Sequence, residues 1–298
     1  MATLYTQQSN NVFKTYLLMG TFLIMVIAIS YAVAWYMGNP IILYIGAGLA
    51  MVTSVGSYWF SDKVVIKMTG AKQITKADAP EYYNIVENLS ITAGLPMPKV
   101  YIVDDPSPNA FATGRDPEHA AVAATSGLLA MLDRTELEGV MAHELAHVGN
   151  RDMLVMTVAV VLAGFVAIVA DIMIRSLLFG GGNDRNRSPI FLVIGIAGII
   201  LAPLAAKMIQ LAISRKREYL ADATGALLTR YPEGLASALE KISSSNVPMQ
   251  RASHATAHLF ISDPFKGEQK GLMKKMAGLF QTHPPAEDRI QRLRNMGV

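Results

Sequence analysis

The chain has 298 residues, of which 52% are hydrophobic and only 16% are charged, and its mean hydropathy is +0.32. This composition is too apolar for an ordinary soluble domain and indicates a membrane protein. The net charge of only +3, without a basic motif interleaved with aromatic residues, argues against nucleic-acid binding. Cysteine is absent, which excludes disulfides, thiol catalysis and cysteine-ligated zinc sites.

The N-terminal part contains a long uncharged stretch, from Thr15 to Ser61, which Gly38-Asn39-Pro40 interrupts near its middle. A membrane span needs about 20 apolar residues, so this stretch predicts two transmembrane helices joined by a tight turn. We assign residues 1–62 to this hairpin and residues 63–79 to a basic juxtamembrane linker. The positive-inside rule places both ends of the hairpin in the cytoplasm, because its turn is uncharged and its flanks carry Lys14, Lys63, Lys67, Lys72 and Lys76.

Residues 80–152 are expected to form the first part of a domain outside the membrane spans. A helix is predicted from Pro80, in its first turn, to Gly94 at its end. A short strand is predicted from Lys99 to Val103, and a second apolar run extends from Ala120 to Ala124. These segments predict a small β-sheet whose edge faces the helix that contains residues 143–147.

The segment Asn109-Ala110-Phe111-Ala112 lies between the two apolar runs and leads by a turn to the second. An extended substrate could add a strand to the sheet edge near it, with backbone hydrogen bonds that tolerate many sequences. The alternative interpretation of Asn109 is a turn residue, and that of Phe111 is a core aromatic.

The segment His143-Glu144-Leu145-Ala146-His147 carries the clearest chemical signal. On a helix, residues four apart share one face, with side chains about 6 Å apart, so both imidazoles can reach one metal ion. Glu144 would then lie beside the ion and could accept a proton from water. An exposed polar helix is the alternative for so short a pattern. A capping box at Thr135 and Glu138 predicts where this helix begins.

A second segment, Arg217-Glu218-Tyr219-Leu220-Ala221-Asp222, supplies a third ligand. Glu218 would complete a His/His/Glu set that leaves one coordination position open, as a catalytic zinc site requires. Asp222 lies one turn further on the same face and could accept a hydrogen bond from a ligand imidazole. The alternative is a solvated acidic face beside the basic residues 215–217.

Two further apolar runs, 153–170 and 188–206, separate the expected ligands. Since His147 and Glu218 must meet at one metal, the chain between them crosses the membrane twice or not at all. We favour a transmembrane hairpin over 153–213. It would separate the first part of a peptidase domain, residues 80–152, from the second part, residues 214–298. Two helices buried in the catalytic domain, or a re-entrant pair, remain as alternatives.

These motifs together resemble the HtpX membrane metallopeptidases, which are related to the CAAX prenyl endopeptidases. The resemblance covers essentially the whole chain and includes the segments 109–114, 143–147, 258–261 and 282–285. It implies a mainly α fold with a small β-sheet, in a multi-pass membrane protein with a zincin-type (gluzincin) metallopeptidase domain. The debated third and fourth hydrophobic segments of that family match the alternatives above.

The resemblance also implies an activity, a cofactor and partners. One zinc ion per chain would be bound by His143, His147 and Glu218, with Glu144 as general base and later proton donor. His283 and Arg289 would support the ligands or the transition state. The expected enzyme lies in the bacterial inner membrane with its peptidase domain in the cytoplasm. It would degrade misfolded or damaged membrane proteins under stress, and other quality-control proteases are further expected partners.

Two other functional classes fit the sequence less well than a zinc endopeptidase. A non-catalytic membrane adaptor with a structural zinc does not need Glu144. A metal transporter predicts ionisable ligands inside the apolar runs, whereas here they flank them. His254 and His258 are also four apart, but no glutamate lies between them, so we interpret their region as a lid or substrate-cleft loop and His119 as a surface histidine.

Overall fold

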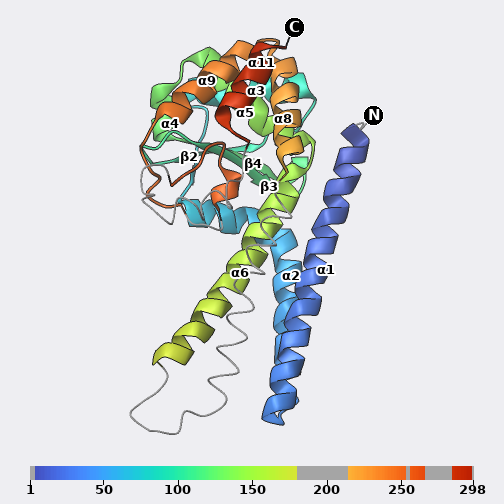
Figure 1. The fold of residues 1–298 in the computed structure, drawn as a ribbon. Coiled ribbons are helices and arrows are strands. Elements are labelled where there is room, and N and C mark those ends of the chain that lie inside the picture. Colours follow the sequence, from blue (N-terminus) through green and yellow to red (C-terminus); the bar gives the residue numbers. More distant parts are fainter. Residues whose placement is uncertain (1–3, 180–213, 253–255, 266–283, 297–298) are drawn as a thin grey trace.

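A computed structural model describes residues 4–179, 214–252, 256–265 and 284–296. Its long helices are α1 (Leu4–Met37), α2 (Ile41–Thr69) and α6 (Asp152–Phe179). All three extend from the same side of the part formed by the sheet and the shorter helices, which is the expected peptidase domain and is called the catalytic part below (Figure 1). Three segments within them are long and apolar enough to cross a membrane: Gln8–Met37, Ile41–Thr69 and Asp152–Val169. The two apolar runs of the N-terminal stretch thus form α1 and α2, which are joined at Gly38 in a left-handed conformation (φ 62°).

Small residues allow α1 and α2 to pack closely. A side chain at Gly46 would collide with Ser30 on the facing helix. The buried face of α2 consists largely of small residues, Ala50, Ser54, Ser57 and Ser61. The opposite faces of the pair expose large apolar side chains, as expected for surfaces that contact lipid; they include Ile24, Trp35, Tyr44 and Val52.

The sheet has four strands in the order β1-β2-β4-β3. Strands β2 (Lys99–Val103) and β4 (Ala120–Thr125) are parallel, whereas β1 (Lys72–Gln73) and β3 (Ala110–Gly114) pair with them in antiparallel fashion. β3 is therefore an edge strand, and it contacts the helix that carries the two histidines, as expected.

That helix, α5 (Arg134–Gly149), lies at the centre of the catalytic part. It packs against α3 (Pro80–Ala93), α8 (Arg215–Thr229), α9 (Pro232–Ser244) and the sheet. Because it is surrounded, its side chains from Val140 to Val148 are all buried. The remaining described helices are α4 (Ser126–Met131), α11 (Ala286–Arg294) and the 3-10 turns Pro117–His119 and Ala257–Leu259.

The predicted helix from Pro80 and its end at Gly94 (φ 64°) are confirmed, as are the strands at 99–103 and 120–124. The predicted capping box was wrong. Asp133 caps α5 by accepting from the backbone N–H of Glu136, whose carboxylate accepts from the N–H of Asp133. Thr135 lies inside the first turn and donates its hydroxyl to Asp133, so it cannot be the cap.

Two other expectations about the chain's organisation differ from the structure or fall outside it. The segment 63–79 is only partly a linker, because α2 continues to Thr69 and β1 follows. Of the second apolar pair, the first run forms α6, which is partly buried against α1 and α2, whereas the run 188–206 lies outside the described residues.

Candidate active site

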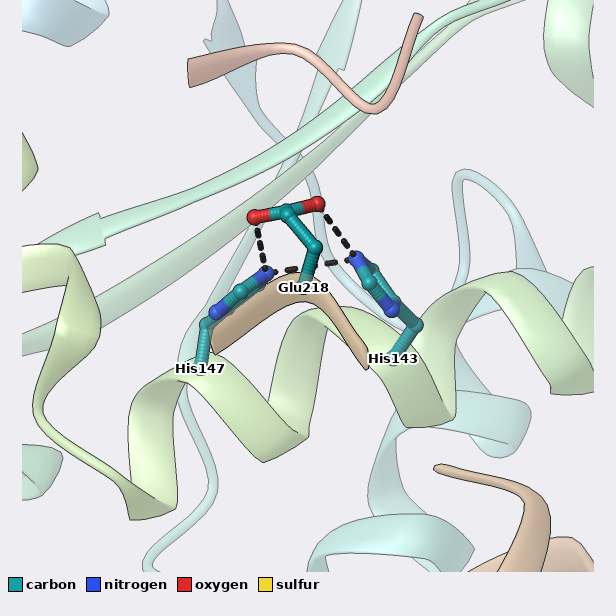
Figure 2. A group of neighbouring side chains, drawn as sticks. All are labelled: His143, His147 and Glu218. Carbon is teal, nitrogen blue, oxygen red and sulfur yellow. Dashed lines mark hydrogen bonds and ion pairs between the residues drawn. The ribbon is translucent and has the colours of Figure 1, made fainter. Parts of the chain in front are cut away.

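His143, His147 and Glu218 converge from α5 and α8 (Figure 2). The Nε2 atoms of the two histidines are 3.2 Å apart, and they lie 3.8 Å and 3.6 Å from the Glu218 carboxylate oxygens, in that order. Donor atoms about 2.1 Å from a tetrahedral zinc ion would be about 3.4 Å from one another. The three buried side chains can therefore hold a single metal ion with little rearrangement.

The distance between α5 and α8 depends on a glycine. Gly225 on α8 faces the backbone of α5, and a Cβ at this position would lie 3.0 Å from the backbone nitrogen of His143. This close approach brings Glu218, two turns earlier on α8, within reach of both imidazoles.

Each ligand histidine has a carboxylate on its other ring nitrogen. Nδ1 of His143 lies 3.0 Å from Asp222, as the sequence led us to expect for Asp222. Nδ1 of His147 lies 3.1 Å from Asp152, which the sequence analysis missed. Each carboxylate accepts a hydrogen bond from the Nδ1–H group of its histidine. Nε2 is therefore left without a proton as the metal-binding nitrogen, and the hydrogen bond increases the basicity of Nε2.

Both carboxylates are paired with arginines. Arg289 donates to Asp222 through Nε and Nη2, at 2.9 Å and 2.6 Å, and its side chain is 2% exposed. Arg217, which the sequence analysis also did not assign to the site, lies 3.3 Å from Asp152. Arg289 is thus next to the ligand set, whereas His283 lies outside the described residues.

Burial and charge set the proton affinities of these groups. Burial lowers the pKa of His143 to about 4, although the hydrogen bond with Asp222 opposes this change. Burial also opposes protonation of His147, but the hydrogen bond with Asp152 and the charge of Glu218 outweigh it and raise its pKa to about 9. The protonated form of His147 reflects the negative charge around it, which would equally attract a divalent cation.

Glu144 lies beside the ligands on α5 and is buried. Burial raises the pKa of its carboxyl group to about 7, against the charge of His147. A group with this pKa can both accept and return a proton near neutral pH, as a general base and acid must. The backbone N–H of Ala112 on β3 opposes this rise because it favours the ionised carboxylate, and β3 packs against α5.

The segment expected to bind substrate lies close to this site. Asn109 bonds through its carboxamide to the backbone of Ser262, and the carbonyl of Ala110 accepts from the N–H of Ile261. Phe111 is buried and packs edge to face against Phe260, as its core interpretation requires. The edge of β3 is thus engaged at Ala110, and substrate pairing there stays a prediction.

The remaining histidines lie away from the ligand set or outside the described residues. His119 is half exposed and pairs with Asp116 on the surface. His258 is buried and its Nε2 lies 3.2 Å from the Met156 carbonyl of α6, whereas His254 is outside the described residues.

Comparison with known proteins is consistent with this geometry. Residues 76–297 match the profile of Peptidase family M48. The protease HtpX homolog of Tropheryma whipplei (strain Twist) is 48% identical, with 99% of each chain covered. That of Thermoanaerobacter pseudethanolicus is 47% identical, covering 99% of this chain and 98% of the relative. The crystal structure of S. mikatae Ste24p gives a TM-score of 0.49 at 17% identity, over 98% of this chain and 67% of that one, too weak a likeness to support a functional inference.

Proposed function

Because this chain belongs to peptidase family M48 and is a metallopeptidase with membrane-spanning helices, we propose that it hydrolyses misfolded or damaged membrane proteins, as a zinc endopeptidase. The observation that carries the proposal is the buried set His143, His147 and Glu218 with Glu144 beside it. Two imidazoles and one carboxylate are a ligand set typical of catalytic zinc, and we propose one zinc ion per chain.

A zinc ion held there would supply the Lewis acidity that peptide hydrolysis by water needs at neutral pH. Glu144 takes the proton of the attacking water and later returns it to the leaving amine. Arg289, held by Asp222, contributes positive charge near the carbonyl oxygen as it becomes negative. An extended substrate that paired with the edge of β3 near Ala112 would lie next to α5 and Glu144, since β3 packs against that helix.

The position of the site relative to the membrane helices supports the proposed substrate class. Asp152, which bonds to His147, is the first residue of α6, so the ligand set lies at the end of an apolar helix. A site held there reaches loops, ends and unfolded segments near the bilayer more readily than distant soluble proteins. We propose a bacterial inner-membrane location with a cytoplasmic peptidase domain, a role in the stress response, and contact with other quality-control proteases.

Glu144→Gln tests the catalytic assignment. With purified protein in detergent and an unfolded membrane protein as substrate, we expect cleavage to fall at least about 100-fold, because the general base is lost. Glu138→Gln is the matched control, since Glu138 lies on the same helix and its carboxylate pairs with the exposed Arg134. Chelation should abolish cleavage and one equivalent of zinc should restore it. Equal cleavage by wild type and Glu144→Gln would refute the proposal.

A second comparison tests the substrate class. The same unfolded segment is offered to the reconstituted enzyme either tethered to a membrane helix or free in solution. We expect faster cleavage of the tethered form, since tethering raises its effective concentration at the membrane surface. Equal rates for the two forms, at equal concentrations in the vesicle suspension, would contradict a preference for membrane proteins.

A further inference from the structure

One face of α1, near its N-terminus, carries polar side chains that contact the catalytic part. Gln8 donates through Nε2 to the carbonyl of Gly149 at 2.7 Å. Asn11, which is 1% exposed, donates through Nδ2 to the carbonyl of Asn150 at 3.1 Å and to Oδ1 of Asp152 at 2.6 Å. The two side chains are three residues apart and therefore lie on the same side of α1.

Two of these acceptors belong to the end of the metal-binding helix. Gly149 is the last residue of α5 and Asn150 is its C-cap, so their carbonyls have no partner within the helix. Gln8 and Asn11 supply donors to these carbonyls from a segment about 140 residues away in the chain. The last turn of α5, which carries His147, is thus held against α1.

The third acceptor leads directly to His147. Asp152 divides its oxygens, with Oδ2 toward Nδ1 of His147 at 3.1 Å and Oδ1 toward Asn11 and Arg217. An amide NH₂ group offers two donors, and here it faces two acceptors, so the orientation of the Asn11 carboxamide is defined. Asn11 therefore holds, together with Arg217, one oxygen of the carboxylate whose other oxygen orients His147.

We propose that Asn11 is a positioning residue for the metal ligand His147, and that it makes the metal site depend on the packing of the first membrane helix. The inference rests on the proposed zinc function. Asn11 lies outside the region that matches Peptidase family M48, which begins at residue 76. Helix α1 can reach the site because its 34 residues span about 51 Å, more than the ~30 Å hydrocarbon core of a bilayer.

The test measures metal affinity by chelator competition, the visible spectrum of the cobalt-loaded protein, and the thermal unfolding of the metal-free protein. We expect Asn11→Ala to weaken zinc binding about 10-fold, at the lower end of the effect of losing a partner of a metal ligand. We also expect it to shift the cobalt spectrum. Asn10→Ala is the matched control, because Asn10 is the neighbouring residue and is exposed; it should leave both readouts unchanged.

A double-mutant cycle separates positioning from general stability. If Asn11 acts through Asp152, then Asn11→Ala should weaken zinc binding no further in an Asp152→Ala background. Asn11→Ser, which keeps one donor, should give an intermediate affinity and serves if Asn11→Ala does not fold. Additive losses, or a lower unfolding temperature with unchanged zinc affinity, would overturn the inference. Wild-type protein that binds no zinc would instead overturn the proposed function.

Discussion

The two ligand histidines are held by the same arrangement of side chains. In each case a buried aspartate bonds to Nδ1 and is itself paired with a buried arginine, so that both buried aspartates have an opposite charge beside them. The two sets are His143–Asp222–Arg289 and His147–Asp152–Arg217. The ligands are therefore oriented before any metal binds, which reduces the conformational entropy that metal binding must overcome.

Arg289→Met tests this arrangement at one residue. The change leaves the Asp222 carboxylate buried without its cation, so we expect the free energy of unfolding of the metal-free protein to fall by about 3–5 kcal/mol. Zinc affinity should fall as well, because Asp222 orients His143. Denaturant unfolding in detergent measures the first effect and chelator competition the second. Arg294→Met is the control on the same helix, since its ion pairs are at the surface and should matter little. Similar losses for both variants would contradict the importance of burial.

At the level of the elements, local signals in the sequence predicted much of the catalytic part. Glycine at a helix end, proline in a first turn and alternating apolar runs predicted α3, β2 and β4. The start of α5 was placed two residues late, because Thr135 and Asp133 both suit an N-cap and only the backbone geometry distinguishes them. Strand β3 carries no strand pattern of its own in the sequence, since its small residues form a strand only through pairing with β4.

The site could be predicted only where its residues share a helix face. His143 and His147 have the spacing of one helical turn, and so do Glu218 and Asp222. Asp152 does not lie on α5, and it meets His147 because the chain turns at Arg151, in a left-handed conformation (φ 56°). Arg151 is not a glycine, so nothing in the sequence marked this turn. The contact between Asn11 and Asp152 depends on tertiary packing alone, which no local pattern encodes.

The close packing of α5 and α8 makes a prediction about Gly225. A Cβ at this position would lie 3.0 Å from the backbone nitrogen of His143. Gly225→Ala should therefore push α8 away from α5 and weaken metal binding by Glu218. We expect a lower unfolding temperature and a lower zinc affinity, although alanine favours helices over glycine by about 1 kcal/mol. Gly164→Ala on α6, where the added methyl group meets no atom of the described residues within 4 Å, is the control and should be neutral or stabilising. Equal behaviour of the two variants would show that α8 has room to move.

At the level of the whole molecule, the three long apolar helices among the described residues leave the catalytic part on one side (Figure 1). This arrangement leaves one orientation in which the exposed apolar faces of α1 and α2 meet lipid while the buried polar ligand set stays outside the bilayer. The lysines that flank the hairpin and its uncharged turn favour the cytoplasm for the catalytic part. The turn at Asn39 and the surface of α9 should then lie on opposite sides of the membrane.

The absence of cysteine allows this orientation to be tested without removing native thiols. Asn39→Cys places a thiol in the exposed turn between α1 and α2, and Glu240→Cys places one on α9, where the Glu240 side chain is 61% exposed. In intact spheroplasts, a membrane-impermeant maleimide should label the first variant and should label the second only after the membrane is permeabilised. A soluble cytoplasmic protein that carries one exposed cysteine is the control, because its labelling would show that the maleimide had crossed the membrane. Labelling of Glu240→Cys but not Asn39→Cys in intact spheroplasts would reverse the proposed orientation, and the catalytic site would then face substrates outside the cytoplasm.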